Sequence, residues 1–160
     1  MSRQNHQELM IVSEKFWSVM KKTLLVVNDN KPMCFLLQTI FQKKYTVTCV
    51  PNAFNAMYEL SRDTQIEVII VDMDFHQKES WNFIQHINSS SLYGNIPVIV
   101  IGSNNEEQTK IKCMELGVIK YFLKPFHPIN LIEAVDTLMG SINVKSITRS
   151  IVNWKTKAEF

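Results

Sequence analysis

Glycine is scarce in this chain, with only four glycines among 160 residues. Dinucleotide- and nucleotide-binding loops need several closely spaced glycines, because the backbone must approach the phosphates without side chains in between. No glycine-rich loop of this kind follows any of the apolar runs. The sequence therefore disfavours a dinucleotide-binding module.

Cysteine is also scarce, and the three cysteines, Cys34, Cys49 and Cys113, lie far apart in the sequence. Zinc sites and disulfide frameworks use closely paired cysteines, so neither is supported. We expect buried, reduced thiols in a cytoplasmic protein. Metal-ligand spacing is likewise missing among the four histidines, which are His6, His76, His86 and His127.

Long apolar runs and a strong excess of one charge are absent too. The longest uninterrupted apolar runs span about five residues, too few for a membrane-spanning helix. Charged residues such as Glu8, Glu14 and Lys15 interrupt the apolar N-terminus, so we expect no signal peptide. The net charge of +2 gives no reason to expect direct nucleic-acid binding.

Apolar, β-branched runs alternate with segments of helical periodicity between residues 23 and 140. This alternation predicts an α/β fold with a parallel sheet covered by helices on both faces. Asn52 and Ser103 are expected to cap the helices that follow them. The predicted strands are 23–28, 45–50, 66–72, 96–101 and 118–123, and the predicted helices are 31–44, 52–63, 80–87, 104–117 and 128–140.

The two ends of the chain, 1–22 and 141–160, each carry apolar residues at helical spacing and predict short amphipathic helices. Two interpretations stay open for them. Each helix packs on its own domain or on the other helix, or it forms a dimer seam or a partner-docking helix. The apolar positions are Leu9, Val12, Phe16 and Val19 in the first segment, and Val144, Ile147, Ile151 and Trp154 in the second.

Charged residues gather where the predicted strands end. Asp29 follows the first strand, Asp72 ends the third with Asp74 in the next loop, and Lys124 ends the fifth. The carboxyl ends of parallel strands meet at one edge of the sheet. Two carboxylates about 4 Å apart repel by roughly 4 kcal/mol at an effective dielectric constant near 20, so such a cluster needs cations. Lys124 supplies one, and a hard divalent ion such as Mg²⁺ would supply the rest.

Four segments in the right order resemble the receiver domain of two-component response regulators. They are "LLVVND", "VIIVDMDFHQKESWNF", "IPVIVIGS" and "GVIKYFLKPF". The resemblance covers about residues 23–140 and leaves short extensions at both ends. It implies a flavodoxin-like, doubly wound, five-stranded parallel sheet of the (βα)₅ type.

The resemblance also implies a site. Asp72 would accept a phosphoryl group from a histidine kinase or phosphotransfer protein, and Lys124 would hold the phosphoryl oxygens. Asp29 and Asp72 would bind Mg²⁺ through their carboxylates and Asp74 through its backbone carbonyl. The peptide bond between Lys124 and Pro125 would be cis.

A switch is implied at Tyr121, whose ring would turn inward on phosphorylation. The sequence departs from the family here, because Gly102 stands where a Thr or Ser hydroxyl normally contacts the phosphoryl group. The neighbouring Ser103 could replace that hydroxyl only through a local irregularity, since adjacent strand residues face opposite sides.

Other departures are Asn28 in place of the usual first acid, His76 in place of Pro and Ser80 in place of Gly. The loss of an acid at Asn28 weakens metal binding without abolishing it, because Asp29 remains. One hypothesis is that the side chain of Asp74 restores the missing carboxylate.

Three functions are compared on these residues. The first is a stand-alone, Mg²⁺-dependent phospho-acceptor, not an enzyme, that signals to an output protein by contact. Its contact surface would lie around the fourth helix, fifth strand and fifth helix, including Ile119, Lys120 and Tyr121. The second is a degenerate receiver that binds its partner without phosphorylation, as the residues at positions 28 and 102 suggest.

The third function is a phosphatase of the haloacid-dehalogenase type, because "VIIVDMDF" also resembles that nucleophile motif. Asp72 would then be the nucleophile and Asp74 the general acid/base. Phe75 and His76 follow where that motif usually has Thr or Val, and the later aspartate pair of such enzymes is absent from the sequence.

Overall fold

The computed structural model describes residues 21–74 and 76–140. The amphipathic positions from Leu9 to Val19 and from Val144 to Trp154, with the dimer or docking contacts considered for them, lie outside these residues. The described elements are β1 (Thr23–Val27), α2 (Lys31–Phe41), β2 (Thr46–Val50), α3 (Ala53–Arg62), β3 (Ile66–Asp72), α4 (Gln77–Ser89), β4 (Val98–Gly102), α5 (Glu107–Glu115), β5 (Lys120–Leu123) and α6 (Pro128–Gly140).

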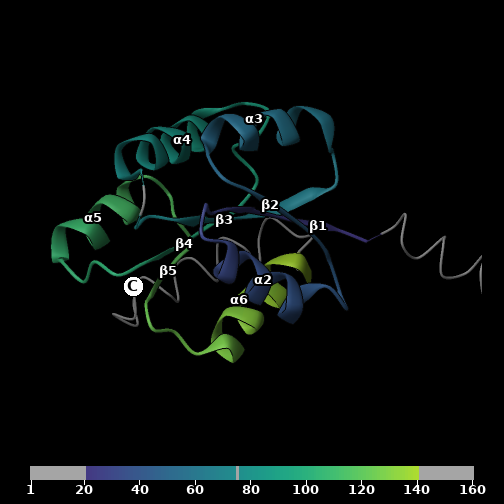
Figure 1. The fold of residues 1–160 in the computed structure, drawn as a ribbon. Helices are drawn as coiled ribbons and strands as arrows, with labels where there is room; N and C mark the ends of the chain where they lie inside the picture. The colour runs from purple at the N-terminus through teal and green to yellow at the C-terminus, as the bar shows by residue number, and fades with distance from the viewer. Residues whose placement is uncertain (1–20, 75, 141–160) are drawn as a thin grey trace, which may run out of the picture.

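The five strands form one sheet in the order β2-β1-β3-β4-β5, and every neighbouring pair is parallel. Helices α3, α4 and α5 cover one face of the sheet, and α2 and α6 cover the other (Figure 1). The predicted doubly wound, five-stranded α/β fold is therefore confirmed.

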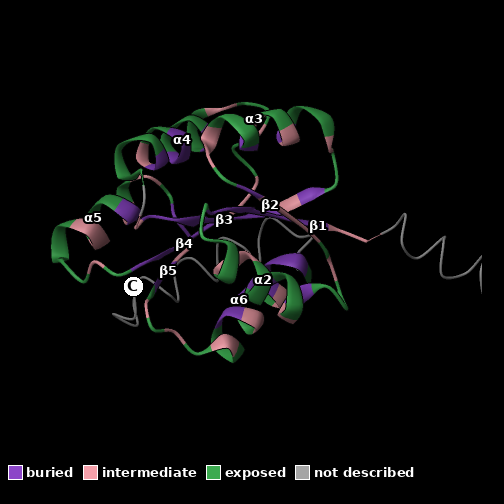
Figure 2. Cartoon of the chain, in the orientation of Figure 1, coloured by how far each residue is buried: buried purple, intermediate pink, exposed green. Residues whose placement is uncertain are grey.

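The core lies on both sides of this sheet, and the central strands are buried along their length (Figure 2). One cluster packs Leu25, Ile69 and Val100 beneath α3, α4 and α5. A second cluster packs Leu24 and Ile99 against α2 and α6. Burial of apolar surface on both faces explains why the strands read as nearly continuous apolar runs instead of alternating ones.

Helix starts agree with the sequence in part. The side chain of Asn52 caps α3 by accepting a hydrogen bond from the backbone N–H of Asn55 at 2.9 Å. The expected cap at Ser103 was wrong, because α5 begins at Glu107 and Glu106 occupies the N-cap position. Asn104 instead accepts a hydrogen bond from the backbone N–H of Glu106 at 2.8 Å, so a short polar loop separates β4 from the helix.

Strand order decides which loops face one another. β1 and β3 are neighbours, with Val27 paired to Val71, so Asn28 and Asp29 leave the sheet beside Asp72. β4 and β5 continue the sheet on the far side of β3, with Gly102 paired to Leu123. Residues from β1, β3, β4 and β5 thus meet at one edge.

Membrane-spanning segments are absent from residues 21–74 and 76–140, where no helix combines the necessary length and apolar character.

The expected contact surface around β5 needs one correction. Ile119 and Tyr121 are buried at 6% and 5% exposure, because their side chains pack into the two cores. Lys120 remains partly exposed and is the member of that trio at the surface.

Candidate functional site

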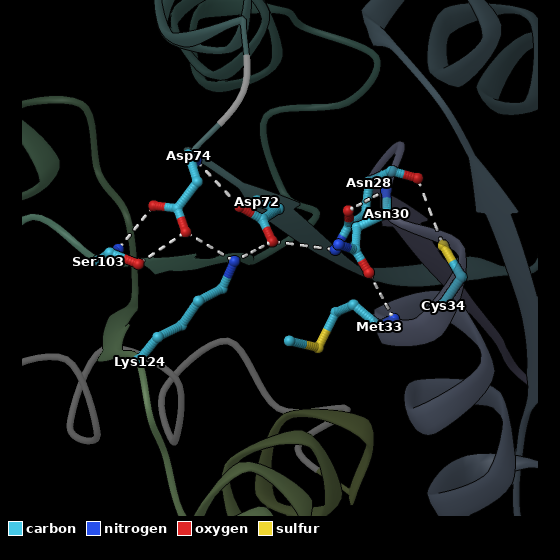
Figure 3. Close-up of polar contacts among 8 residues, drawn as sticks. All are labelled: Asn28, Asn30, Met33, Cys34, Asp72, Asp74, Ser103 and Lys124. Atoms are coloured by element: carbon cyan, nitrogen blue, oxygen red, sulfur yellow. Dashed lines mark hydrogen bonds and ion pairs between the residues drawn. The ribbon is translucent and has the colours of Figure 1, made fainter.

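Asp72 stands at the centre of the polar cluster at the carboxyl edge of the sheet (Figure 3). It ends β3, and only 3% of its side chain is exposed. Oδ1 accepts a hydrogen bond from the backbone N–H of Asp74 at 2.9 Å. Oδ2 accepts hydrogen bonds from Asn28 at 3.0 Å and from Lys124 at 2.5 Å. A buried carboxylate is stable only when it is partnered in this way.

Lys124 reaches the cluster from the end of β5. Its Nζ lies 2.5 Å from Asp72 Oδ2 and 2.8 Å from Asp74 Oδ2, so one ammonium group bridges two carboxylates. Burial works against the charged lysine, but the hydrogen bonds that it donates to both carboxylates outweigh this effect and raise the pKa of Lys124 above its usual value. The bond between Lys124 and Pro125 is cis, as the resemblance implied.

Asp74 faces β4 and β5. Ser103 donates two hydrogen bonds to its carboxylate, one from the backbone N–H and one from Oγ, both at 2.7 Å. Burial opposes ionisation of Asp74, but the hydrogen bonds from Lys124 and Ser103 prevail, and its pKa is lowered. Asn28 lies on the other side of Asp72 (Figure 3). The idea that Asp74 replaces the acid missing at Asn28 stays a prediction.

Asn28 is buried at 6% exposure, at the end of β1. Its Nδ2 donates to Asp72, and its Oδ1 accepts a hydrogen bond from the backbone N–H of Asn30 at 2.8 Å. The amide therefore orients Asp72 without adding a negative charge. A carboxylate in the same place would repel Asp72 unless a cation stood between them.

Asp29 is more open than Asp72, with 36% of its side chain exposed, and its Oδ2 lies 3.6 Å from Nε2 of His76. Both side chains line a cavity of about 20 Å³ that Asp72 also borders. That volume is enough for one water molecule. Among the described residues, no three His, Cys, Asp or Glu side chains already stand close enough to hold a metal ion between them.

Tyr121 lies inward, beneath the loop that follows β4. Its hydroxyl donates a hydrogen bond to the backbone carbonyl of Asn104 at 2.7 Å. Burial is the main reason that its pKa is raised, to about 12. A Cβ placed on Gly102 would lie only 2.6 Å from the Tyr121 hydroxyl. The inward position of the ring thus depends on the missing side chain at residue 102.

A family model for the response regulator receiver domain matches residues 24–136. The chain belongs to this family. The predicted identity of the domain is confirmed, and the match falls within the predicted boundaries of 23–140.

Relatives agree with this assignment. The chain is 26% identical over 136 residues to the phosphate regulon transcriptional regulatory protein PhoB of Escherichia coli, covering 82% of this chain and 58% of that one. It is 30% identical over 126 residues to the transcriptional regulatory protein KdpE of Staphylococcus aureus, covering 78% of this chain and 50% of that one. The chain therefore spans only 50–58% of the length of these relatives.

Solved structures show the same fold. A response regulator from Thermotoga maritima superposes with a TM-score of 0.67 at 25% identity, covering 76% of this chain and 99% of that one. The Mn²⁺-bound form of response regulator Rcp1 superposes with a TM-score of 0.61 at 21% identity, covering 75% of this chain and 91% of that one.

The donor set fits the divalent ion that this receiver family implies. Asp29 and Asp72 offer carboxylate oxygens beside one small cavity, and the backbone carbonyl of Asp74 is the third protein ligand that the resemblance implies. Mg²⁺ typically uses one or two carboxylates and keeps several waters, so two carboxylates suffice. Asp72 and Asp74 share the single ammonium group of Lys124, which leaves negative charge for an ion to neutralise.

The structure brings together most of the residues predicted from the sequence, namely Asp72, Asp74, Lys124 and Ser103 (Figure 3). Two contacts were missed. Asn28 was treated as a loss, whereas its amide holds Asp72 in place. His76 was given no role, although its Nε2 lies 3.6 Å from Oδ2 of Asp29. The signal in the sequence was a histidine that follows Asp72 and Asp74 closely, at a position where the family has Pro.

Proposed function

We propose that this receiver domain accepts a phosphoryl group on Asp72, with Mg²⁺ bound by Asp29, Asp72 and the carbonyl of Asp74. The donor would be a histidine kinase or phosphotransfer protein in the cytoplasm. The observation that carries the proposal is the bridge from Lys124 to Asp72 and Asp74 beside the small cavity. It concentrates positive charge where a phosphoryl group would need it.

The chemistry assigned to the side chains is simple. A carboxylate oxygen of Asp72 attacks the phosphorus atom of the donor, the bond from phosphorus to the donor breaks, and an acyl phosphate forms. Asn28 and the backbone N–H of Asp74 keep the carboxylate oriented through both oxygens. Lys124 is placed to turn from the carboxylates to the phosphoryl oxygens. A bound Mg²⁺ would neutralise charge on the transferred group.

Signalling would proceed by contact with an output protein. A groove of about 740 Å³ lies between α5, β5 and α6, and its lining includes Lys110, Lys120, Leu123 and Phe126. Tyr121 also borders this groove, so a movement of its ring would change the groove directly. The groove therefore supports an output-contact surface near β5 and α6. Ile119 is buried and is not part of that surface.

A second function is favoured by one specific observation. Tyr121 already lies inward because Gly102 leaves space for it. Its position would then not depend on phosphorylation, which is what a phosphorylation-independent receiver requires.

The phosphatase alternative gains no such support. A general acid must be protonated near neutral pH, whereas the pKa of Asp74 is lowered by Lys124 and Ser103.

Beryllofluoride, a phosphoryl mimic, separates the first function from the second. We expect ¹H–¹⁵N spectra of the wild-type chain to change when Mg²⁺ and beryllofluoride are both present, with shifts at the amides of Met73, Asp74 and Ser103. The mimic needs the carboxylate of Asp72, so Asp72→Asn should show no such change. Beryllofluoride that leaves the wild-type spectrum unchanged in Mg²⁺ would favour the phosphorylation-independent receiver.

A further inference from the structure

His76 brings an imidazole to the edge of the metal site. It precedes α4 in a left-handed backbone conformation, with φ at 52°, and its Nε2 points to within 3.6 Å of Asp29 Oδ2. The same cavity of about 20 Å³ is lined by His76, Asp29, Asp72 and Glu79. Three carboxylates and one imidazole therefore border this small cavity, although among the described residues no three of these groups are yet close enough to hold an ion.

The separation between His76 and Asp29 is close to that of two ligands on one ion. For bonds near 2.1 Å and angles between 90° and 109°, two such ligand atoms are about 3.0–3.4 Å apart. The observed 3.6 Å needs an adjustment of only a few tenths of an ångström. His76 is 62% exposed at its side chain, so packing does not oppose such a movement.

Imidazole nitrogen is a poor ligand for Mg²⁺ and a good one for divalent transition ions. We propose that His76 is a ligand of the metal site in this chain and shifts its selectivity from Mg²⁺ towards first-row transition ions. The inference rests on the proposed function, because it uses the same Asp29–Asp72 site. The competing interpretation is an ion pair in which a protonated His76 competes with the metal for Asp29.

Calorimetric titration of the full chain with Co²⁺ and with Mg²⁺ distinguishes these interpretations. We expect His76→Ala to weaken Co²⁺ binding by about tenfold or more and Mg²⁺ binding by less than about threefold. His86→Ala removes a histidine from the other end of α4 and serves as the matched control. Both of its affinities should equal those of the wild type.

A direct readout comes from histidine side-chain ¹⁵N spectra with Zn²⁺, where the Nε2 signal of one histidine should shift and be missing in His76→Ala. Unchanged Co²⁺ affinity in His76→Ala, with Mg²⁺ still bound, would overturn the inference and leave the proposed function intact. Tighter binding of either ion would establish the competing ion pair instead. A wild-type chain that binds neither ion would overturn both the inference and the metal-dependent function.

Discussion

Replacing Lys124 with methionine is expected to slow phosphoryl transfer to Asp72 by about a hundredfold or more, as loss of one charge-stabilising donor typically does. Lys124 is the ammonium group that contacts both Asp72 and Asp74, at 2.5 and 2.8 Å. Methionine keeps the length of the side chain and removes its charge. The rate is measured by intact-mass spectrometry over time with a small-molecule phosphoryl donor and Mg²⁺.

The same variant should also be less stable in metal-free buffer. Asp72 would keep only neutral donors, and an ionised carboxylate that has lost its charged partner is costly to bury. Because 19% of the Lys124 side chain is exposed to solvent, we expect a loss of about 2 kcal/mol in the free energy of unfolding, less than for a fully buried pair. Urea denaturation measures this loss.

Lys43→Met is the matched control, since it removes the same charge from an exposed turn between α2 and β2. It should leave both the transfer rate and the stability close to wild type. If Lys124→Met behaves like this control in both assays, the ammonium group is not what neutralises the carboxylates, and the account of the site fails.

Gly102→Thr is expected to expel Tyr121 from its inward position. The Cβ alone would lie 2.6 Å from the tyrosine hydroxyl, which is closer than the two atoms can stay. The end of the tyrosine must move, and its hydrogen bond to Asn104 is lost with it. The ring then becomes accessible to solvent.

Absorbance at 295 nm follows this change through the ionisation of tyrosine. Burial raises the pKa of Tyr121 to about 12 in the wild type, and an exposed phenol ionises near 10. At pH 11 the Gly102→Thr chain should therefore contain about one more tyrosinate than the wild type. Gly140→Thr is the control, because a Cβ there meets nothing within 4 Å. Identical titrations of wild type and Gly102→Thr would show that Gly102 does not decide where Tyr121 lies.

Much of the fold follows from local patterns in the sequence. Apolar runs and helical periodicity predicted β3 at 66–72 and α6 at 128–140 with the bounds that the structure has. Asp72 and Lys124 were predicted to meet because the carboxyl ends of parallel strands share one edge. Only residue types and strand order were needed for that step.

Other features depend on contacts that local patterns do not contain. Several polar residues precede α5, and the local pattern does not say which of them caps the helix. Ser103 instead donates its hydrogen bonds to Asp74, a residue 29 positions away. The contact between Gly102 and Tyr121 depends on how β4 and β5 align. The position of His76 depends on a left-handed backbone that is uncommon for a residue other than glycine.

Intact-mass analysis after incubation with acetyl phosphate and Mg²⁺ shows whether Asp72 is a phosphoryl acceptor. We expect the wild-type chain to gain the mass of one phosphoryl group and Asp72→Ala to gain none. A wild-type chain that gains no mass, or an equal gain in both chains, would contradict this expectation.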